Sequence, residues 1–223
     1  MTEQEKIINH LNGPAAVLAS AGSGKTYTLI ERIKKLSATI EPSRLVMLTF
    51  TNAAADEMKF RAAKANDKCK DVLACTYHKY CGLMLRRYGK EIGIEPSFEI
   101  LTSMKYRTLI EYVKSSNEYY ESLKNFPSAS KLDKIFSILA NCDDVSLGSL
   151  IYNTKYSMYE ADILNLYNEV KKYGLENQKL NFDDMLVYMN QLLSITPLEL
   201  ILIAFAAVGI ILFFRACWRN IKK

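Results

Sequence analysis

The sequence predicts an α/β fold with a helical insertion and an apolar C-terminal helix, and three observations lead to this prediction. In the first 93 residues, short apolar runs alternate with segments of helical periodicity, which is typical of a parallel sheet covered by helices. From residue 94 to residue 193 only helical periodicity continues, so we expect a helical subdomain there. Residues 200–214 contain no polar side chain, and we expect them to form a hydrophobic helix.

The elements of the first part follow from the apolar runs and from the helical spacing of apolar residues between them. Each run is bounded by turn or polar residues and is short enough for one buried strand. The expected strands are Ala15–Ala19, Leu45–Thr49 and Val72–Thr76, and the expected helices are 26–37, 53–65 and 77–89.

The second part carries apolar residues at spacings of three and four, the period of one helix face. No segment in it has the pattern of a strong strand. The expected helices are Met104–Val113, Lys131–Leu139, Tyr159–Tyr173 and Phe182–Leu193.

The composition excludes several classes of protein. With 223 residues, of which 49% are hydrophobic, the chain can bury a core and is neither disordered nor of low complexity. Five cysteines do not suit a disulfide framework, and an odd number without an N-terminal signal sequence favours a reducing compartment, so we expect a cytoplasmic body. Cys69, Cys75 and Cys81 are spaced by six, which is not a zinc pattern, and we expect Cys75 in the core.

A glycine-rich loop follows the first expected strand and opens a helix. Its small residues let backbone N–H groups approach a polyphosphate, and the helix N-terminus adds donors and a favourable dipole. Lys25 would reach the β- and γ-phosphates of ATP, and the Thr26 hydroxyl would bind Mg²⁺. The usual first glycine of the pattern is Ala19 here, and the alternative is a loop that merely turns a strand into a helix. The nucleotide-binding residues expected from this loop are Ser20, Ala21, Gly22, Ser23, Gly24, Lys25 and Thr26.

Four further segments before and after the loop are informative because of their residues and their order along the chain. Gln4 lies upstream, Leu48–Met58 contains the run Thr-Phe-Thr-Asn, Thr76–Tyr80 contains Thr-Tyr-His, and Asn181–Leu186 follows the helical part. Over residues 4–193, this order resembles the N-terminal part of the UvrD/Rep family of superfamily 1 DNA helicases. An unrelated P-loop enzyme such as a kinase would have no use for the Thr-Phe-Thr-Asn and Thr-Tyr-His segments at these places.

The resemblance implies a RecA-like P-loop domain interrupted by a helical insert, and ATP-driven translocation along single-stranded DNA. The implied parts are the ATP-binding domain over 1–93, the insert over 94–178, a return helix over 179–194 and an apolar tail over 195–223.

The resemblance also implies roles for single residues. Gln4 would recognise adenine, while Lys25 and Thr26 would hold the phosphates and Mg²⁺. The segments after the second and third strands would line the channel for single-stranded DNA. Their implied DNA-binding residues are Phe50, Thr51, Asn52, Thr76, Tyr77 and His78.

The residues around these segments suit a nucleic-acid backbone. Phe50, Tyr77 and Tyr80 offer rings for base stacking, worth about 1–3 kcal/mol per base. Residues 59–90 hold nine cations and two carboxylates, so we expect DNA binding that weakens with salt. The alternative is that Phe50 and Tyr77 belong to the core and that the lysines form a solvated face.

The chain departs from the family after Asp184. In the family, the Phe-Asp-Asp-Met-Leu helix precedes an apolar strand ending in Asp-Glu, whose carboxylates hold Mg²⁺ and polarise the attacking water. Here no Asp-Glu pair follows Asp184, and the second RecA-like domain is absent too. We therefore expect a truncated helicase segment that binds ATP without unwinding DNA, and the catalytic residues stay unknown. Asp183 and Asp184 themselves are expected in a helix cap or first turn rather than at a metal.

The missing strand would normally lie in the middle of the sheet, so its loss predicts an exposed sheet edge. Such a sheet would be marginally stable, or it would need a second polypeptide that completes it.

The apolar tail, residues 195–223, admits several interpretations. A membrane-spanning helix is one expectation, because Trp218 and four cations lie near its end, and a membrane is then a partner. The corresponding alternative function is a non-catalytic, membrane-tethered binding or regulatory protein. The remaining alternatives are a buried or aggregation-prone helix, an apolar run packed against the open sheet, and an accidental reading frame fused to a helicase fragment.

Overall fold

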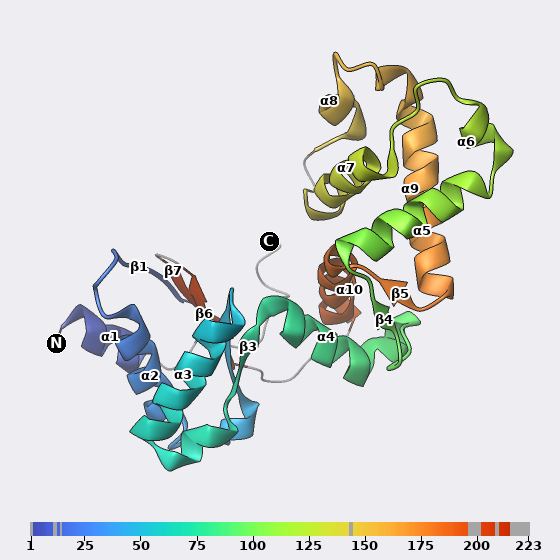
Figure 1. The fold of residues 1–223 in the computed structure, drawn as a ribbon. Coiled ribbons are helices and arrows are strands. Elements are labelled where there is room, and N and C mark those ends of the chain that lie inside the picture. Colours follow the sequence, from blue (N-terminus) through green and yellow to red (C-terminus); the bar gives the residue numbers. More distant parts are fainter. Residues whose placement is uncertain are drawn as a thin grey trace. The chain divides into compact units, whose positions relative to one another are not determined.

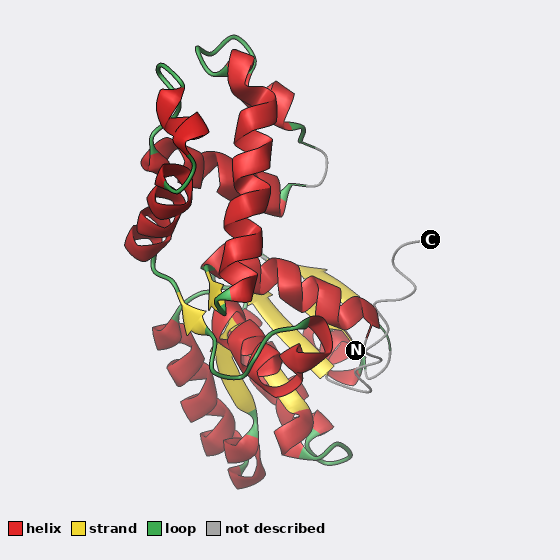
Figure 2. Ribbon diagram, turned by 90° about the vertical axis from the view of Figure 1, so that its right-hand side faces the viewer, coloured by secondary structure: helices red, strands yellow, loops and turns green. Residues whose placement is uncertain are grey.

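The computed structural model describes two compact units (Figures 1 and 2). One consists of Met1–Tyr80 with Leu193–Lys223, and the other is Cys81–Leu192. The residues described are 2–10, 13, 15–142, 145–195, 202–207 and 210–214, the last two ranges by their backbone. The first unit contains a five-stranded sheet with its helices, and the second unit is almost entirely helical.

The sheet of the first unit has the order β1-β7-β6-β2-β3. Three of its strands are β1 (Ala15–Leu18), β2 (Leu45–Thr49) and β3 (Leu73–Thr76), which confirms the strands predicted from the apolar runs. The other two are β6 (Leu202–Ala207) and β7 (Ile210–Phe214). β2 is parallel to β3 and to β6, whereas β7 is antiparallel to both of its neighbours.

Helices of the first unit cover one face of this sheet. They are α1 (Glu3–Asn9), α2 (Lys25–Leu36) and α3 (Asn52–Ala65), and α4 (Tyr77–Tyr88) begins after β3. Short 3₁₀ helices, Pro42–Arg44 and Asp67–Asp71, precede β2 and β3. The predicted helices over 26–37, 53–65 and 77–89 are confirmed. The core that joins helices to strands consists mainly of Leu29, Ile30, Ile33 and Leu36 from α2, Leu45 and Met47 from β2, and Met58 and Ala62 from α3.

The prediction of a hydrophobic C-terminal helix is wrong for residues 202–207 and 210–214, which form strands. β6 pairs with β2 and β7 pairs with β1, so the two strands occupy the middle of the sheet, where the sequence predicted a gap. Without them, the N–H and C=O groups along β1 and one side of β2 would lack ladder partners, which is costly when they are buried. The sheet is consequently mixed, and the prediction of an all-parallel sheet is also corrected.

The membrane-spanning interpretation of 195–223 receives no support. Among the helices that the structure describes, none combines the length and the apolar character needed to cross a bilayer. The remaining residues of that tail, 196–201, 208–209 and 215–223, lie outside the described residues.

The second unit is built from helices around its own apolar core, as the periodicity predicted. Leu109 and Ile110 of one helix, Phe136 of another and Leu166 of a third are among its buried residues. The helices are α5 (Ser103–Ser115), α6 (Glu118–Ser122), α7 (Ala129–Asn141), α8 (Leu147–Ile151), α9 (Glu160–Glu176) and α10 (Phe182–Ile195), with 3₁₀ turns at Gly89–Ile92 and Ser157–Tyr159.

Two strands in this unit were not predicted, because each has only two residues and shows no pattern. β4 (Glu99–Ile100) and β5 (Lys179–Leu180) pair in parallel, and they lie just before α5 and just before α10. They bring together the two chain segments that enter and leave the bundle α5–α9.

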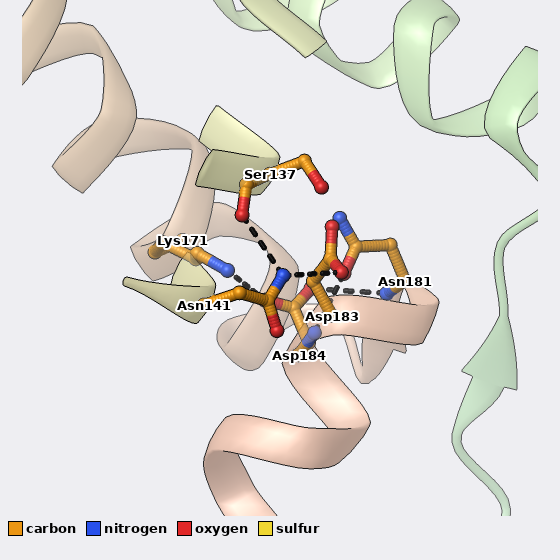
Figure 3. A network of polar contacts seen from close by, with 6 residues as sticks. All are labelled: Ser137, Asn141, Lys171, Asn181, Asp183 and Asp184. Atoms are coloured by element: carbon orange, nitrogen blue, oxygen red, sulfur yellow. Dashed lines mark hydrogen bonds and ion pairs between the residues drawn. The ribbon is translucent and has the colours of Figure 1, made fainter. Parts of the chain in front are cut away.

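A polar network fixes the start of α10, as Figure 3 shows. The backbone N–H of Asn181 donates to Asp184 Oδ2 (2.9 Å), and the N–H of Asp184 donates to Asn181 Oδ1 (2.7 Å). Lys171 of α9 forms an ion pair with Asp184, and Asn141 Nδ2 of α7 donates to Asp183 Oδ1 (2.7 Å). This confirms the prediction that the Asp-Asp pair serves the helix start. Among the described residues there is no cluster of side chains suited to a metal ion.

The pairing of β6 with β2 predicts that the C-terminal strands stabilise the sheet. A chain that stops after Ile195 should lose more than about 3 kcal/mol of unfolding free energy, because several ladder hydrogen bonds worth about 0.5–1.5 kcal/mol each disappear. A chain that stops after Phe214 keeps both strands and should unfold like the parent. Denaturant unfolding and limited proteolysis measure the difference. Equal stability of the two shortened chains would show that these strands do not complete the sheet.

Candidate functional site

Three segments singled out in the sequence lie at one edge of the sheet. β1 is antiparallel to β7, β7 is antiparallel to β6, and β6 is parallel to β2, so β1 runs in the same direction as β2 and β3. The glycine-rich loop after β1 and the segments after β2 and β3 therefore all leave the sheet at its carboxyl edge. This edge is where open α/β sheets bind their ligands.

The loop after β1 wraps in front of the N-terminus of α2. Gly22 and Gly24 have φ angles of 77° and 82°, which only glycine adopts readily, and Ser23 N–H donates to the Ser20 carbonyl at 3.4 Å. Gly24 is the N-cap of α2, and the first N–H that closes a helical bond is that of Thr28, to Gly24 O at 2.9 Å. The N–H groups before it are the donors with which a helix N-terminus binds phosphate.

Lys25 lies across this loop. Its Nζ donates to the carbonyls of Ala19 (3.1 Å) and Ser20 (2.6 Å), and the side chain is half-buried. An ammonium has three donors, so the third can serve a phosphate oxygen without breaking either contact. Thr26, also half-buried, is the second residue of α2. Both residues thus stand at the helix start, as the P-loop pattern requires.

Gln4 reaches the same loop from α1. A capping box starts this helix, with Glu5 N–H on Thr2 Oγ1 (3.1 Å) and Thr2 N–H on Glu5 Oε2 (2.7 Å). In the same first turn, Gln4 Nε2 donates to the Ser23 carbonyl at 3.0 Å. A cavity of about 340 Å³ lies between the helix and the loop. Its lining residues are Glu3, Gln4, Ile7, Val17, Leu18, Ala19, Ser20, Ser23, Lys25 and Thr28.

Two residues of α2 that sequence reasoning missed belong to this arrangement. Thr28 is buried, and its Oγ1 donates to Gly24 O at 3.1 Å, so it ties the helix start to the loop. Arg32 is fully buried and donates from Nη1 to the carbonyl of Ile7 in α1 at 2.8 Å. Its position could have been noticed, because it shares the apolar helix face of Leu29 and Leu36 at helical spacing.

The segment after β2 presents an exposed ring and then a capped helix. Phe50 has an exposed fraction of 65%. Thr51 is the N-cap of α3, where its Oγ1 accepts from the N–H of Ala54 at 3.2 Å, and Asn52 begins the helix on the exposed side. Thr51 therefore has a structural role whether or not it meets a ligand.

The segment after β3 is built in the same way. Thr49 and Thr76 are paired at the ends of β2 and β3, so the two segments start side by side. Thr76 Oγ1 accepts from the N–H of Lys79 at 3.3 Å, Tyr77 is 41% exposed and His78 is half-buried. Phe50 and Tyr77 thus stand as neighbouring exposed rings at one edge of the sheet.

Tyr80 does not belong with them. Its ring is buried, and a buried ring offers no face to a base, so its predicted part in base stacking is wrong. Cys75 is buried too, and burial raises the pKa of its thiol, although the nearby Lys79 opposes this shift. The prediction that Cys75 is a core residue is confirmed.

All nine cations of residues 59–90 are exposed, but several are already engaged. Arg61 pairs with Glu57 and Lys70 with Asp67. Arg86 lies over the ring of Phe98 at 4.3 Å and donates to the Pro96 carbonyl at 2.5 Å, which gives it a structural role. Of these nine, the members of the first unit for which the structure gives no such partner are Lys59, Lys64, Lys68 and Lys79.

Comparison with known proteins gives a consistent result. A family model described as "UvrD/REP helicase N-terminal domain" matches residues 1–201. The chain is 33% identical over 195 residues to a protein of Mycoplasma capricolum named "Probable DNA helicase II homolog", covering 85% of this chain and 27% of that one. It is 29% identical to "ATP-dependent DNA helicase PcrA" of Staphylococcus aureus (88% of this chain, 27% of the relative) and 30% identical to PcrA of Bacillus subtilis (87% and 26%). The chain spans about a quarter of the length of these relatives.

The contact between Gln4 and the loop can be tested with two glycines. A Cβ at Gly24 would lie 2.9 Å from Gln4 Nε2, whereas a Cβ at Gly22 meets nothing within 4 Å. Gly22→Ala and Gly24→Ala should each cost about 1–2 kcal/mol of stability because of their positive φ. Only Gly24→Ala should shift the NMR resonances of the Gln4 side-chain amide. The same shift in Gly22→Ala, or none in either variant, would contradict the geometry.

Proposed function

The chain belongs to the UvrD/REP helicase family, and from this membership we propose that it binds ATP with Mg²⁺ and single-stranded DNA as the N-terminal segment of a DNA helicase. The observation that carries the proposal is the common direction of β1, β2 and β3, which puts the P-loop and the exposed rings at one sheet edge. In this proposal residues 1–93 form a RecA-like ATP-binding domain, 94–178 its insert and 179–194 the helix that returns to it.

Backbone N–H donors and the positive charge of Lys25 support the binding of nucleotide. The N-terminus of α2 and Lys25 receive the phosphates, and the Thr26 hydroxyl joins the ligands of Mg²⁺. The remaining residues of the loop, from Ser20 to Gly24, contribute backbone N–H groups. Gln4, whose amide already lies on the loop, binds the adenine from α1.

The DNA part rests on exposed rings beside cations. Phe50 and Tyr77 offer faces on which bases stack, and Lys79 adds positive charge in the first turn of α4. Thr51, Asn52, Thr76 and His78 complete this surface with polar groups that can contact the sugar-phosphate backbone. Stacking on two rings is tolerant of sequence, so binding is non-specific and depends on salt.

The proposal ends at binding and does not extend to rapid turnover. Hydrolysis of ATP uses carboxylates that hold Mg²⁺ and orient water. Among the described residues that line the cavity, Glu3 is the only carboxylate, and it lies in the first turn of α1.

The first test concerns nucleotide. Lys25→Ala should abolish binding of a fluorescent ATP analogue, because it removes the cation placed at the β- and γ-phosphates. Lys34→Ala, which removes an exposed cation from the far end of α2, is the matched control and should bind like the parent. Thr26→Ala should weaken binding in Mg²⁺ more than in EDTA. Unchanged affinity of Lys25→Ala would refute the P-loop assignment.

The second test concerns DNA and uses two equally exposed rings. Phe50 and Phe60 both have an exposed fraction of 65%, but only Phe50 lies at the sheet edge. Phe50→Ala should weaken binding of a fluorescent oligothymidine by about 1–3 kcal/mol, as loss of one stacking ring does, while Phe60→Ala should leave it unchanged. Affinity that is independent of salt, or equal losses in both variants, would contradict the proposed DNA surface.

A further inference from the structure

The helix that carries Gln4 is poorly secured by itself. α1 has seven residues, none of them buried, and an isolated helix of this length is unstable in water. Glu3, Gln4 and Ile7 nevertheless form one wall of the cavity beside the P-loop. The position of this wall must therefore be set by contacts with the rest of the unit.

One polar contact to α1 comes from a buried cation. Arg32 has no exposed surface, and its guanidinium donates to the carbonyl of Ile7 at 2.8 Å. Burial lowers the pKa of Arg32 to about 10, so the side chain is still charged at neutral pH. A buried charge is costly unless it is hydrogen-bonded. Movement of α1 away from α2 would take the Ile7 carbonyl from the guanidinium and so remove a hydrogen bond that stabilises the buried charge.

A second cation of α2, on the surface of the unit, also contacts α1. Lys35 is exposed and donates to the side-chain oxygen of Asn9, at the end of α1. Both cations meet the C-terminal end of α1, where the helix dipole is negative. Ile7 also packs against the core of the unit. α1 is thus held at its C-terminal end by α2 and at its N-terminal side by the Gln4 contact with Ser23.

We propose that Arg32 is a positioning residue for base recognition: by holding the Ile7 carbonyl, it keeps α1 and the Gln4 amide at the P-loop. This inference rests on the proposed function and adds a specificity-determining residue to it. Arg32 does not line the cavity, so it acts on the nucleotide through α1 and not by contact. The phosphate site is formed by the other end of α2 and does not need α1.

The test separates base recognition from phosphate binding. Affinities for Mg²⁺-ATP, Mg²⁺-GTP and inorganic tripolyphosphate are measured on the full chain, with Gln4→Ala giving the ATP/GTP ratio that remains without the amide. Arg32→Met, which keeps the bulk of the side chain but none of its donors, should lower the ATP/GTP preference at least about fivefold. Its affinity for tripolyphosphate should stay within about twofold of the parent.

Two neighbouring lysines give a matched pair that does not disturb the core. Lys35→Met removes a contact with α1 and should lower the preference about twofold, whereas Lys34→Met removes only an exposed partner of Glu31 and should have no effect. Hydrogen exchange of the amides of residues 6–9 should be faster in Arg32→Met and in Lys35→Met than in Lys34→Met. Restored preference in Arg32→Lys would support a role for the donated hydrogen bond.

The inference is overturned if folded Arg32→Met keeps the ATP/GTP ratio of the parent, or if it loses tripolyphosphate as strongly as ATP. If Arg32→Met does not fold, equal ratios in Lys34→Met and Lys35→Met overturn it. Failure of the proposed function looks different, because tripolyphosphate would then bind the parent no better than it binds Lys25→Ala. A parent without any preference for ATP over GTP also refutes base recognition from α1.

Discussion

The arrangement of the first unit depends on the ladder between β2 and β6. β1 makes no ladder contact with β2, because β7 and β6 lie between them, so the hydrogen-bonded path from one to the other runs through the C-terminal strands. The carboxyl edge that unites the P-loop with Phe50 and Tyr77 exists only if these strands are in place. The apolar segments 202–207 and 210–214 thereby fix the geometry of both proposed sites.

The same strands set the distance across the site. Neighbouring strands lie about 4.8 Å apart, so the three intervals from β1 to β2 place these strands about 14 Å from each other. The packing of α2 against α3, whose residues Ile33 and Met58 share one core, connects the two proposed sites. A single strand in place of β6 and β7 would bring the two sites closer by one interval.

The sequence predicted most of this fold where local pattern and tertiary packing agree. β2 is buried along its whole length, and the helices after β1 and β3 have clear apolar faces, so both strand and helix signals were strong there. The prediction of a C-terminal helix failed because an apolar run of fifteen residues has no period that distinguishes a helix from a strand. Whether such a run becomes a strand depends on whether a sheet offers it an unpaired edge. The prediction that Tyr80 stacks on bases failed for a related reason. The sequence does not show which of the aromatic residues of one helix face solvent, as Tyr77 does, and which are buried, as Tyr80 is. The P-loop was easier, because glycines and a lysine at fixed spacing specify a loop without reference to packing.

The P-loop also stabilises the charge of Lys25 in the absence of a phosphate. Lys25 is half-buried, and the carbonyls of Ala19 and Ser20 accept from its ammonium, so the charge is stabilised before any phosphate arrives. Such hydrogen bonds to a charged group contribute about 1.5–3 kcal/mol each, which holds the side chain across the loop in place of many free rotamers. Because an ammonium keeps a third donor, a phosphate can bind without first breaking these contacts. The loop is therefore organised in advance by the same side chain that would later contact the ligand, and less ordering is required when nucleotide binds.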